Sequence, residues 1–153
     1  MHLSTYLGLQ HAASRTLAES FRQVAEGHRA EPDVHQDCHT LAGMCDAHVH
    51  RLAPVAERYG EEREEEPERL HAEGLPGVRS GGIGLLRDLH DLYVLASFVD
   101  ITWTVLEQAG QGVRDRELVD VVRSCDQDTK RQLLWLNTRI KQAAPQALIA
   151  AAA

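Results

Sequence analysis

The chain has 153 residues, of which 43% are hydrophobic and 25% are charged, so we expect neither a disordered tail nor a membrane protein. This length suits one domain that buries its own core. The formal net charge of −7 argues against a nucleic-acid partner, because phosphate binding needs a basic surface. The three cysteines are an odd number, which excludes a fully paired disulfide framework.

The sequence pattern favours a cytoplasmic protein with reduced cysteines. Residues 1–7 lack a basic region followed by an apolar one, so we expect no secretory signal. Aspartate, arginine and histidine interrupt the longest apolar stretches, whereas a membrane span needs about 20 apolar residues. Thiols stay reduced in the cytoplasm, which agrees with this location.

Two helices are predicted in the first part of the chain, over residues 4–27 and 32–59. Both segments repeat apolar or small residues every three or four positions, and Pro32 is well placed in the first turn of the second helix. The first stripe includes the polar residues Gln10 and Ser14. Pro54 lies inside the second pattern and predicts one bent helix. The inward stripe of the second helix comprises Val34, Cys38, Leu41, Cys45, His48, Leu52, Val55 and Tyr59.

Residues 60–84 break the helical pattern with a run of glutamates followed by a glycine-rich stretch. Such a connection is too long for a tight turn and suits a crossover from one end of a helical bundle to the other. Residues 57–73 contain eight glutamates and three arginines, so most of the acidic excess belongs to this connection.

The third predicted helix, residues 85–110, is the most apolar. Its core stripe comprises Leu85, Leu89, Leu92, Ala96, Val99, Trp103 and Leu106. Leu95, Phe98, Ile101 and Val105 widen this stripe well beyond one face. A helix that is apolar most of the way round must be buried on two sides, so we predict a homodimer formed through this helix.

The fourth predicted helix covers residues 115–144, with Asp115 as N-cap and an end before Pro145. Its stripe comprises Leu118, Val122, Cys125, Thr129, Leu133, Leu136 and Ile140. No segment shows the alternation of a strand. The predicted fold class is therefore all-α: a single domain over residues 1–153, built as a four-helix bundle with one long crossover between helices 2 and 3.

The chain resembles the ferritin-like four-helix bundles, and in particular small bacterial members of that superfamily. The resemblance extends over most of the chain and rests on four stretches: His11–Phe21, Cys45-Asp46-Ala47-His48, Ser97–Trp103 and Leu133–Leu148. It implies the same fold and raises the question of a di-iron site in the bundle core. That site uses one glutamate on each of two helices and a Glu-x-x-His pair on each of the other two.

Most of the di-iron ligands that the resemblance implies are missing from this chain. The carboxylate position of helix 1 falls at Ser14, and the pair of helix 2 falls at Cys45 and His48, so only the histidine remains. The glutamate position of helix 3 falls near Phe98, and the nearest carboxylate is that of Asp100. The pair of helix 4 falls at Val122 and Cys125, or one residue later at Arg123 and Asp126. Two irons need several hard oxygen donors, so we expect a degenerate di-iron site that does not work as a ferroxidase or di-iron oxidase.

Residues equally distant from the two hairpin turns should share a middle layer of the bundle. This layer is predicted to contain Ser14, Cys45, His48, Phe98, Asp100, Cys125 and Asp126. One interpretation is a metal site with His48, Cys45, Cys125, Asp100 and Asp126 as ligands, holding a single zinc, copper or iron ion. The other is a polar core layer without a cofactor, in which His48 is hydrogen-bonded to Ser14 or Asp100.

Nine histidines are a high number for this length, but their spacing places few of them on a common helix face. His35 and His39 have the i, i+4 spacing of a surface chelator, which exposed histidines also show by chance. The sequence therefore favours a non-enzymatic structural or ligand-binding homodimer, with a metal-binding protein as the alternative.

Overall fold

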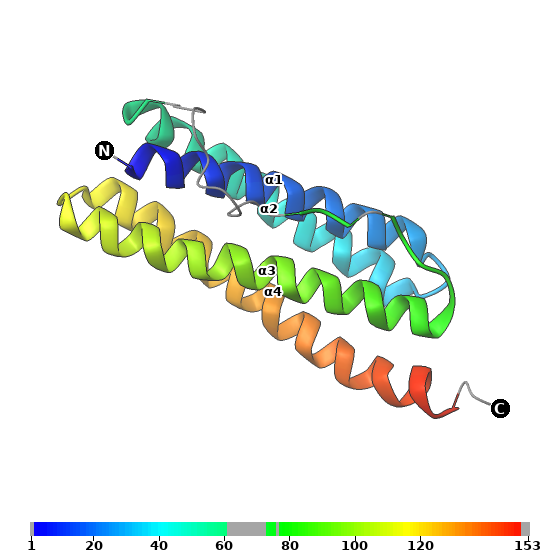
Figure 1. The fold of residues 1–153 in the computed structure, drawn as a ribbon. Coiled ribbons are helices and arrows are strands. Elements are labelled where there is room, and N and C mark those ends of the chain that lie inside the picture. The colour runs from blue at the N-terminus through cyan, green and yellow to red at the C-terminus, as the bar shows by residue number, and fades with distance from the viewer. Residues whose placement is uncertain (1, 61–72, 76, 151–153) are drawn as a thin grey trace.

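The computed structural model describes residues 2–60, 73–75 and 77–150, and it is a bundle of four helices (Figure 1). The helices are α1 (Leu3–Gly27), α2 (Pro32–Arg58), α3 (Gly81–Gly112) and α4 (Arg116–Leu148). The described residues contain no strand. The predicted all-α four-helix architecture is confirmed.

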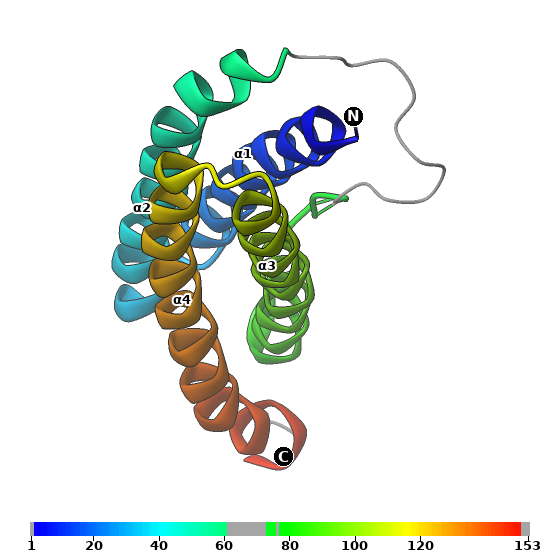
Figure 2. The same cartoon turned by 90° about the vertical axis from the view of Figure 1, so that its left-hand side faces the viewer.

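The bundle consists of two helical hairpins that pack against each other. The closest pairs are α1 with α2 and α3 with α4, while α1 also packs on α3 and α2 on α4. Figures 1 and 2 show that α2 ends at the end of the bundle where α1 begins, and that α3 starts at the opposite end. Helices α2 and α3 therefore run in the same direction.

The last part of the connection between α2 and α3 lies along α1. Leu75 is buried, and Val78 sits so close to Gly27 that a Cβ on this glycine would lie 2.6 Å from a Val78 methyl group. A Cβ on Gly74 would similarly lie 3.2 Å from Thr16. Residues 61–72, about half of the predicted crossover, lie outside the described residues.

A buried carboxylate anchors this connection to the bundle. Asp88 of α3 is fully buried and lies 2.7 Å from His28 Nε2, just beyond the end of α1. It also accepts hydrogen bonds from the backbone N–H and the guanidinium of Arg79, both at 3.0 Å. Arg79 in turn reaches Asp91 at 2.8 Å. These bonds connect α1, the end of the connection and α3 at one end of the molecule.

Three details of the helices follow from local chemistry. Pro32 occupies the first turn of α2, where its missing N–H costs no hydrogen bond. Pro54 lies inside α2, which continues to Arg58 as one helix and curves visibly in Figure 2. Asp115 is the N-cap of α4, as predicted, and accepts a hydrogen bond from Leu118 N–H at 3.1 Å.

Two predicted helix ends are wrong. α3 begins at Gly81 rather than residue 85, and α4 passes through Pro145 and ends at Leu148. The reason is packing: Ala143 and Ala147 are buried, and a Cβ on Gly82 would lie 3.8 Å from the Cα of Ala147. The end of α4 and the start of α3 thus cover each other, and this contact extends both helices.

The core follows the predicted stripes closely. Every residue of the third stripe is buried, and in the second stripe only Tyr59 is partly exposed. Among the described residues, ten polar or charged ones are buried as well, and several of these lie on the same inward stripes. The core is therefore continuous but not purely apolar.

Candidate functional site

A polar part of the core surrounds His48, which is 1% exposed. Its Nε2 lies 2.9 Å from Oδ2 of Asp128 on α4, and its ring meets that of Trp103 edge-on with 5.9 Å between centroids. Burial lowers the pKa of His48, and the hydrogen bond to Asp128 opposes this shift. The histidine faces the core as expected, but its partner is Asp128, and not the expected Ser14 or Asp100.

A chain of hydrogen bonds continues from Trp103 into α4. The indole Nε1 donates to Thr129 Oγ1 at 3.0 Å, and this hydroxyl donates to the backbone carbonyl of Cys125 at 3.2 Å. Trp103, Thr129 and Cys125 are all fully buried. The indole, which needs a partner when it is buried, is thereby satisfied.

Two buried glutamines connect helices that belong to different hairpins. Gln10 of α1 donates its Nε2–H to the carbonyl of Val99 on α3 at 2.9 Å. Gln132 of α4 donates to the carbonyl of Leu41 on α2 at 3.1 Å and lies 3.2 Å from Cys45 Sγ. We call the set Gln10, Ser14, Cys45, His48, Trp103, Asp128, Thr129 and Gln132 the buried polar network.

Three buried atoms of this network have no hydrogen-bond partner among the described residues: Gln10 Oε1, Ser14 Oγ and Gln132 Oε1. Leaving such an atom unpaired in a core costs roughly 1–3 kcal/mol. All three are uncharged oxygens. They can accept hydrogen bonds from a small polar group, but they cannot balance the charge of two iron ions.

The cysteines are poor candidates for thiolate ligands in this environment. Burial raises the pKa of Cys38 and of Cys45 to about 12, and that of Cys125 to about 11. All three thiols therefore remain protonated near neutral pH. A metal would have to displace these protons, since the thiolate is the form that binds.

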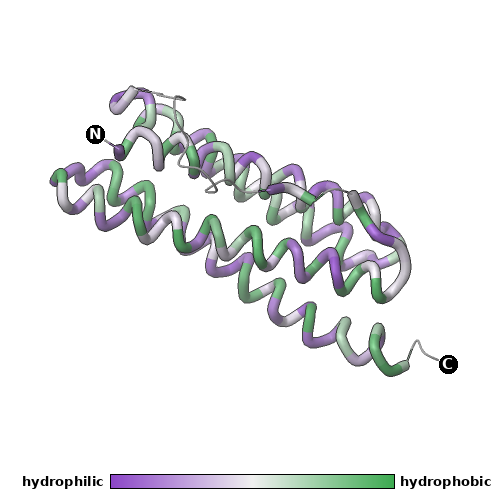
Figure 3. The backbone as a smooth tube through the Cα atoms, viewed as in Figure 1, coloured by the Kyte–Doolittle hydropathy of each residue, from purple (hydrophilic) through white to green (hydrophobic). Residues whose placement is uncertain are grey.

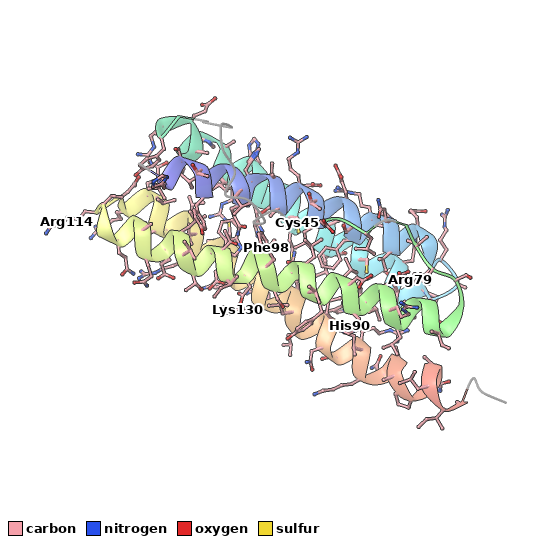
Figure 4. The ribbon with its side chains drawn as sticks, viewed as in Figure 1. Cys45, Arg79, His90, Phe98, Arg114 and Lys130 are labelled. Carbon is pink, nitrogen blue, oxygen red and sulfur yellow. The ribbon has the colours of Figure 1, made fainter. Side chains whose placement is uncertain are left out.

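The predicted ligands fall into two groups in the structure. His48, Cys45 and Cys125 are buried, whereas Asp100 and Asp126 lie at the seam of α3 and α4. Both carboxylates accept hydrogen bonds from Lys130 Nζ, at 3.0 Å and 3.1 Å. Figure 4 shows Cys45 within the bundle and Lys130 at its outer edge. The two aspartates are thus engaged by a surface lysine.

Sequence reasoning missed Asp128 and Gln132, although it noted Gln10, Ser14 and Thr129 on the apolar stripes. Gln132 lies seven residues after Cys125, on the same face of α4, which is the signal that could have identified it. Asp128 has no such signal, because its side chain is a quarter exposed and reaches His48 from the edge of the core.

A second candidate site is the outward surface of α3. Val94, Ile101 and Val105 are 61%, 59% and 41% exposed, and the partly buried Phe98 lies between them in the sequence. Their spacing of four, three and four residues places them in one stripe along the helix. We call these four residues the α3 stripe. Figure 3 shows how much of α3 is hydrophobic, in contrast to α4.

Helix α3 also has the length and composition of a membrane-spanning helix, whereas the sequence pattern led us to expect no such segment. Its most apolar window has a mean hydropathy of 1.2, and 44% of that window is buried inside the bundle. Core helices of helical bundles have the same properties, so this finding establishes no location.

The fold and these sites define the class of the protein as an all-α four-helix bundle with a polar layer in its core. No family model, curated protein or solved structure matches the chain.

Proposed function

We propose that this is a ferritin-like bundle with a degenerate di-iron site, which acts in the cytoplasm as a non-enzymatic structural or ligand-binding homodimer. The observation that carries the proposal is the composition of the core at the ligand positions. Ser14 and Cys45 are buried, and Phe98 is partly buried, at positions where the resemblance implies carboxylates. The long connection between α2 and α3, which run in the same direction, supports the ferritin-like topology.

In this proposal the buried polar network has a structural role, because its hydrogen bonds join the helices. Gln10 and Gln132 each join two helices across the hairpin interface, and His48 and Trp103 join α2, α3 and α4. Networks of this kind rigidify a core and select one arrangement of helices. The oxygens of Gln10, Ser14 and Gln132, which lack a partner among the described residues, can each accept a hydrogen bond from a small polar ligand.

The α3 stripe supports the homodimer. Three neighbouring large apolar side chains on one helix face are unfavourable in water, and a two-fold contact would cover the same stripe on both copies. Trp103 and Leu106 on the opposite face remain in the core of each protomer. The acidic net charge of −7 supports a partner other than nucleic acid.

The alternative is a single zinc, copper or iron ion held by His48, Cys45 and Cys125, with Asp100 and Asp126 as further ligands. The unpaired oxygen of Gln132 favours this alternative, because Nε2 of the same side chain lies 3.2 Å from Cys45 Sγ. The high thiol pKa values and the ion pairs of Asp100 and Asp126 with Lys130 oppose it.

Metal analysis of core variants distinguishes the two. Protein is purified without an affinity tag, and its metal content is compared with that of the double variant Cys45→Ala, Cys125→Ala. The proposal predicts that the double variant binds as much metal as the wild type. A stoichiometric metal that is present in the wild type and lost in the double variant would establish the core metal site and contradict the proposal.

A further inference from the structure

We propose that Glu26, His35 and His39 bind a single divalent transition-metal cation such as zinc, at the turn that joins α1 to α2. This site lies outside the buried polar network and is independent of the proposed function. Glu26 comes from the last turn of α1, and the two histidines come from the first turns of α2. The site therefore spans two helices.

The three side chains already converge. Each offers one ligand atom, and these atoms all lie within 4.8 Å of one another. Glu26 Oε1 lies 2.7 Å from His39 Nε2. The centroids of the two imidazole rings are 5.0 Å apart. Their four-residue spacing places both rings on one face of α2, which is the arrangement of paired histidine ligands on a helix.

Neighbouring groups orient two of the ligands. His35 Nδ1 lies 2.9 Å from the backbone carbonyl of Ala25, an acceptor that requires the proton on Nδ1 and leaves the lone pair on Nε2. Arg29 lies 3.3 Å from Glu26 Oε2, which leaves the other carboxylate oxygen, Oε1, facing His39. Hydrogen bonds of this kind fix the tautomer and direction of metal ligands.

The ligand chemistry selects the cation. Two imidazoles and one carboxylate suit zinc, whereas magnesium and calcium prefer oxygen ligands alone. Tetrahedral zinc with bonds of about 2.0–2.1 Å separates its ligands by about 3.3 Å. Glu26 and His39, 2.7 Å apart, must therefore move apart slightly, and the other two distances, which are at most 4.8 Å, must adjust toward the same value. The His39 and Glu26 side chains are 40% and 50% exposed, so they are free to adjust and water can take the fourth position.

Zinc titration tests the site. Tag-free protein competes with a chromophoric chelator for zinc, and we expect one zinc ion per chain. His39→Ala and Glu26→Gln each weaken binding about tenfold or more, since they remove a ligand from an exposed position without disturbing the core. Cobalt(II) should give the visible absorption of a tetrahedral ion in the wild type, and His39→Ala should lose it.

The matched control is His50→Ala, which removes another exposed histidine of α2. This variant and the core variant Cys45→Ala, Cys125→Ala should bind zinc as the wild type does. The proposal is overturned if the wild type binds no zinc or if His39→Ala binds zinc as tightly as the wild type. It is also overturned if His50→Ala weakens zinc binding as much as His39→Ala does. Loss of zinc binding only in the core variant would contradict both this site and the proposed function. Absence of zinc binding at Glu26, His35 and His39, with unchanged metal content in the core variant, would contradict this site alone.

Discussion

Single residues contribute unequally to the stability of the bundle, and we expect a large contribution from Asp88. Its carboxylate is fully buried between His28 and Arg79. Removal of one partner of a buried ion pair typically costs about 3–5 kcal/mol. Asp88→Asn should lower the free energy of unfolding by about 2–3 kcal/mol, less than that range because Arg79 is partly exposed and keeps its contact with Asp91. Urea denaturation measures this change.

Asp91→Asn is the matched control, because Asp91 binds the same arginine from a position that is 45% exposed. Exposed ion pairs contribute at most about 1 kcal/mol. Equal destabilisation by the two variants would show that burial of Asp88 has no special role.

Asp115 should make the stability of the bundle sensitive to acid. The hydrogen bond from Tyr59, 2.5 Å long, is the largest cause that lowers the pKa of this carboxyl below its ordinary value of 3.8. Because the folded-state pKa is lower than the unfolded one, the stabilisation is present above about pH 4 and is lost as the pH falls through the folded-state pKa.

Urea denaturation at pH 7 and at pH 3 measures this dependence. Asp115→Asn, which keeps an N-cap side chain but cannot ionise, should lose less stability between these two pH values than the wild type does. An identical loss in both proteins would show that Asp115 does not contribute to the acid sensitivity.

At the residue scale, the sequence predicted which side chains face the core better than it predicted their partners. The helical period alone placed His48, Cys45 and Cys125 inside. The hydrogen bond of His48 to Asp128 depends on how far the side chain of a partly exposed residue reaches across the interface of α2 and α4. Spacing along one helix contains no information about that reach.

At the scale of helices, glycines offer a direct test of packing. A Cβ on Gly84, near the start of α3, would lie 2.8 Å from the backbone carbon of Arg79. Gly84→Ala should therefore destabilise the protein by more than about 1 kcal/mol, although alanine is the better helix former.

Gly43 of α2 is the matched control, because a Cβ at this position would meet no packing neighbour within 4 Å. Gly43→Ala should therefore stabilise the protein by about 0.5–1 kcal/mol. Thermal denaturation of both variants measures the two opposite shifts. Stabilisation by Gly84→Ala would show that the connection does not pack on α3 as described.

The helices themselves could be predicted from periodicity, whereas two of their ends could not. Glycine and proline at residues 81–84 and 145 usually mark helix boundaries, which explains the errors. In the structure, Ala143 and Ala147 are buried, and Gly82 at the start of α3 lies close to Ala147. We infer that this contact stabilises both ends. This tertiary contact outweighs the local preference.

At the scale of the whole molecule, the two faces of α3 differ in their surroundings. Its inner face supplies the core, including Trp103, and its outer face carries the α3 stripe. The four-helix architecture followed from the sequence because each segment carries its own apolar stripe. The occupant of the outer face remains a prediction, because exposed apolar side chains indicate an interface without naming the partner.

Charged substitutions on the stripe separate dimerisation from folding. Val94→Glu, Ile101→Glu should give a folded monomer, because both side chains are exposed in the protomer and a buried charge opposes association. Val113→Glu, at an exposed position beyond the end of α3, should leave the proposed dimer intact.

The most direct test of the proposed homodimer is the mass of the tag-free wild-type protein by sedimentation equilibrium at micromolar concentration. We predict a dimer of twice the chain mass of 17.0 kDa, which the substitutions at Val94 and Ile101 convert to a monomer. A wild-type mass of 17.0 kDa would contradict the homodimer.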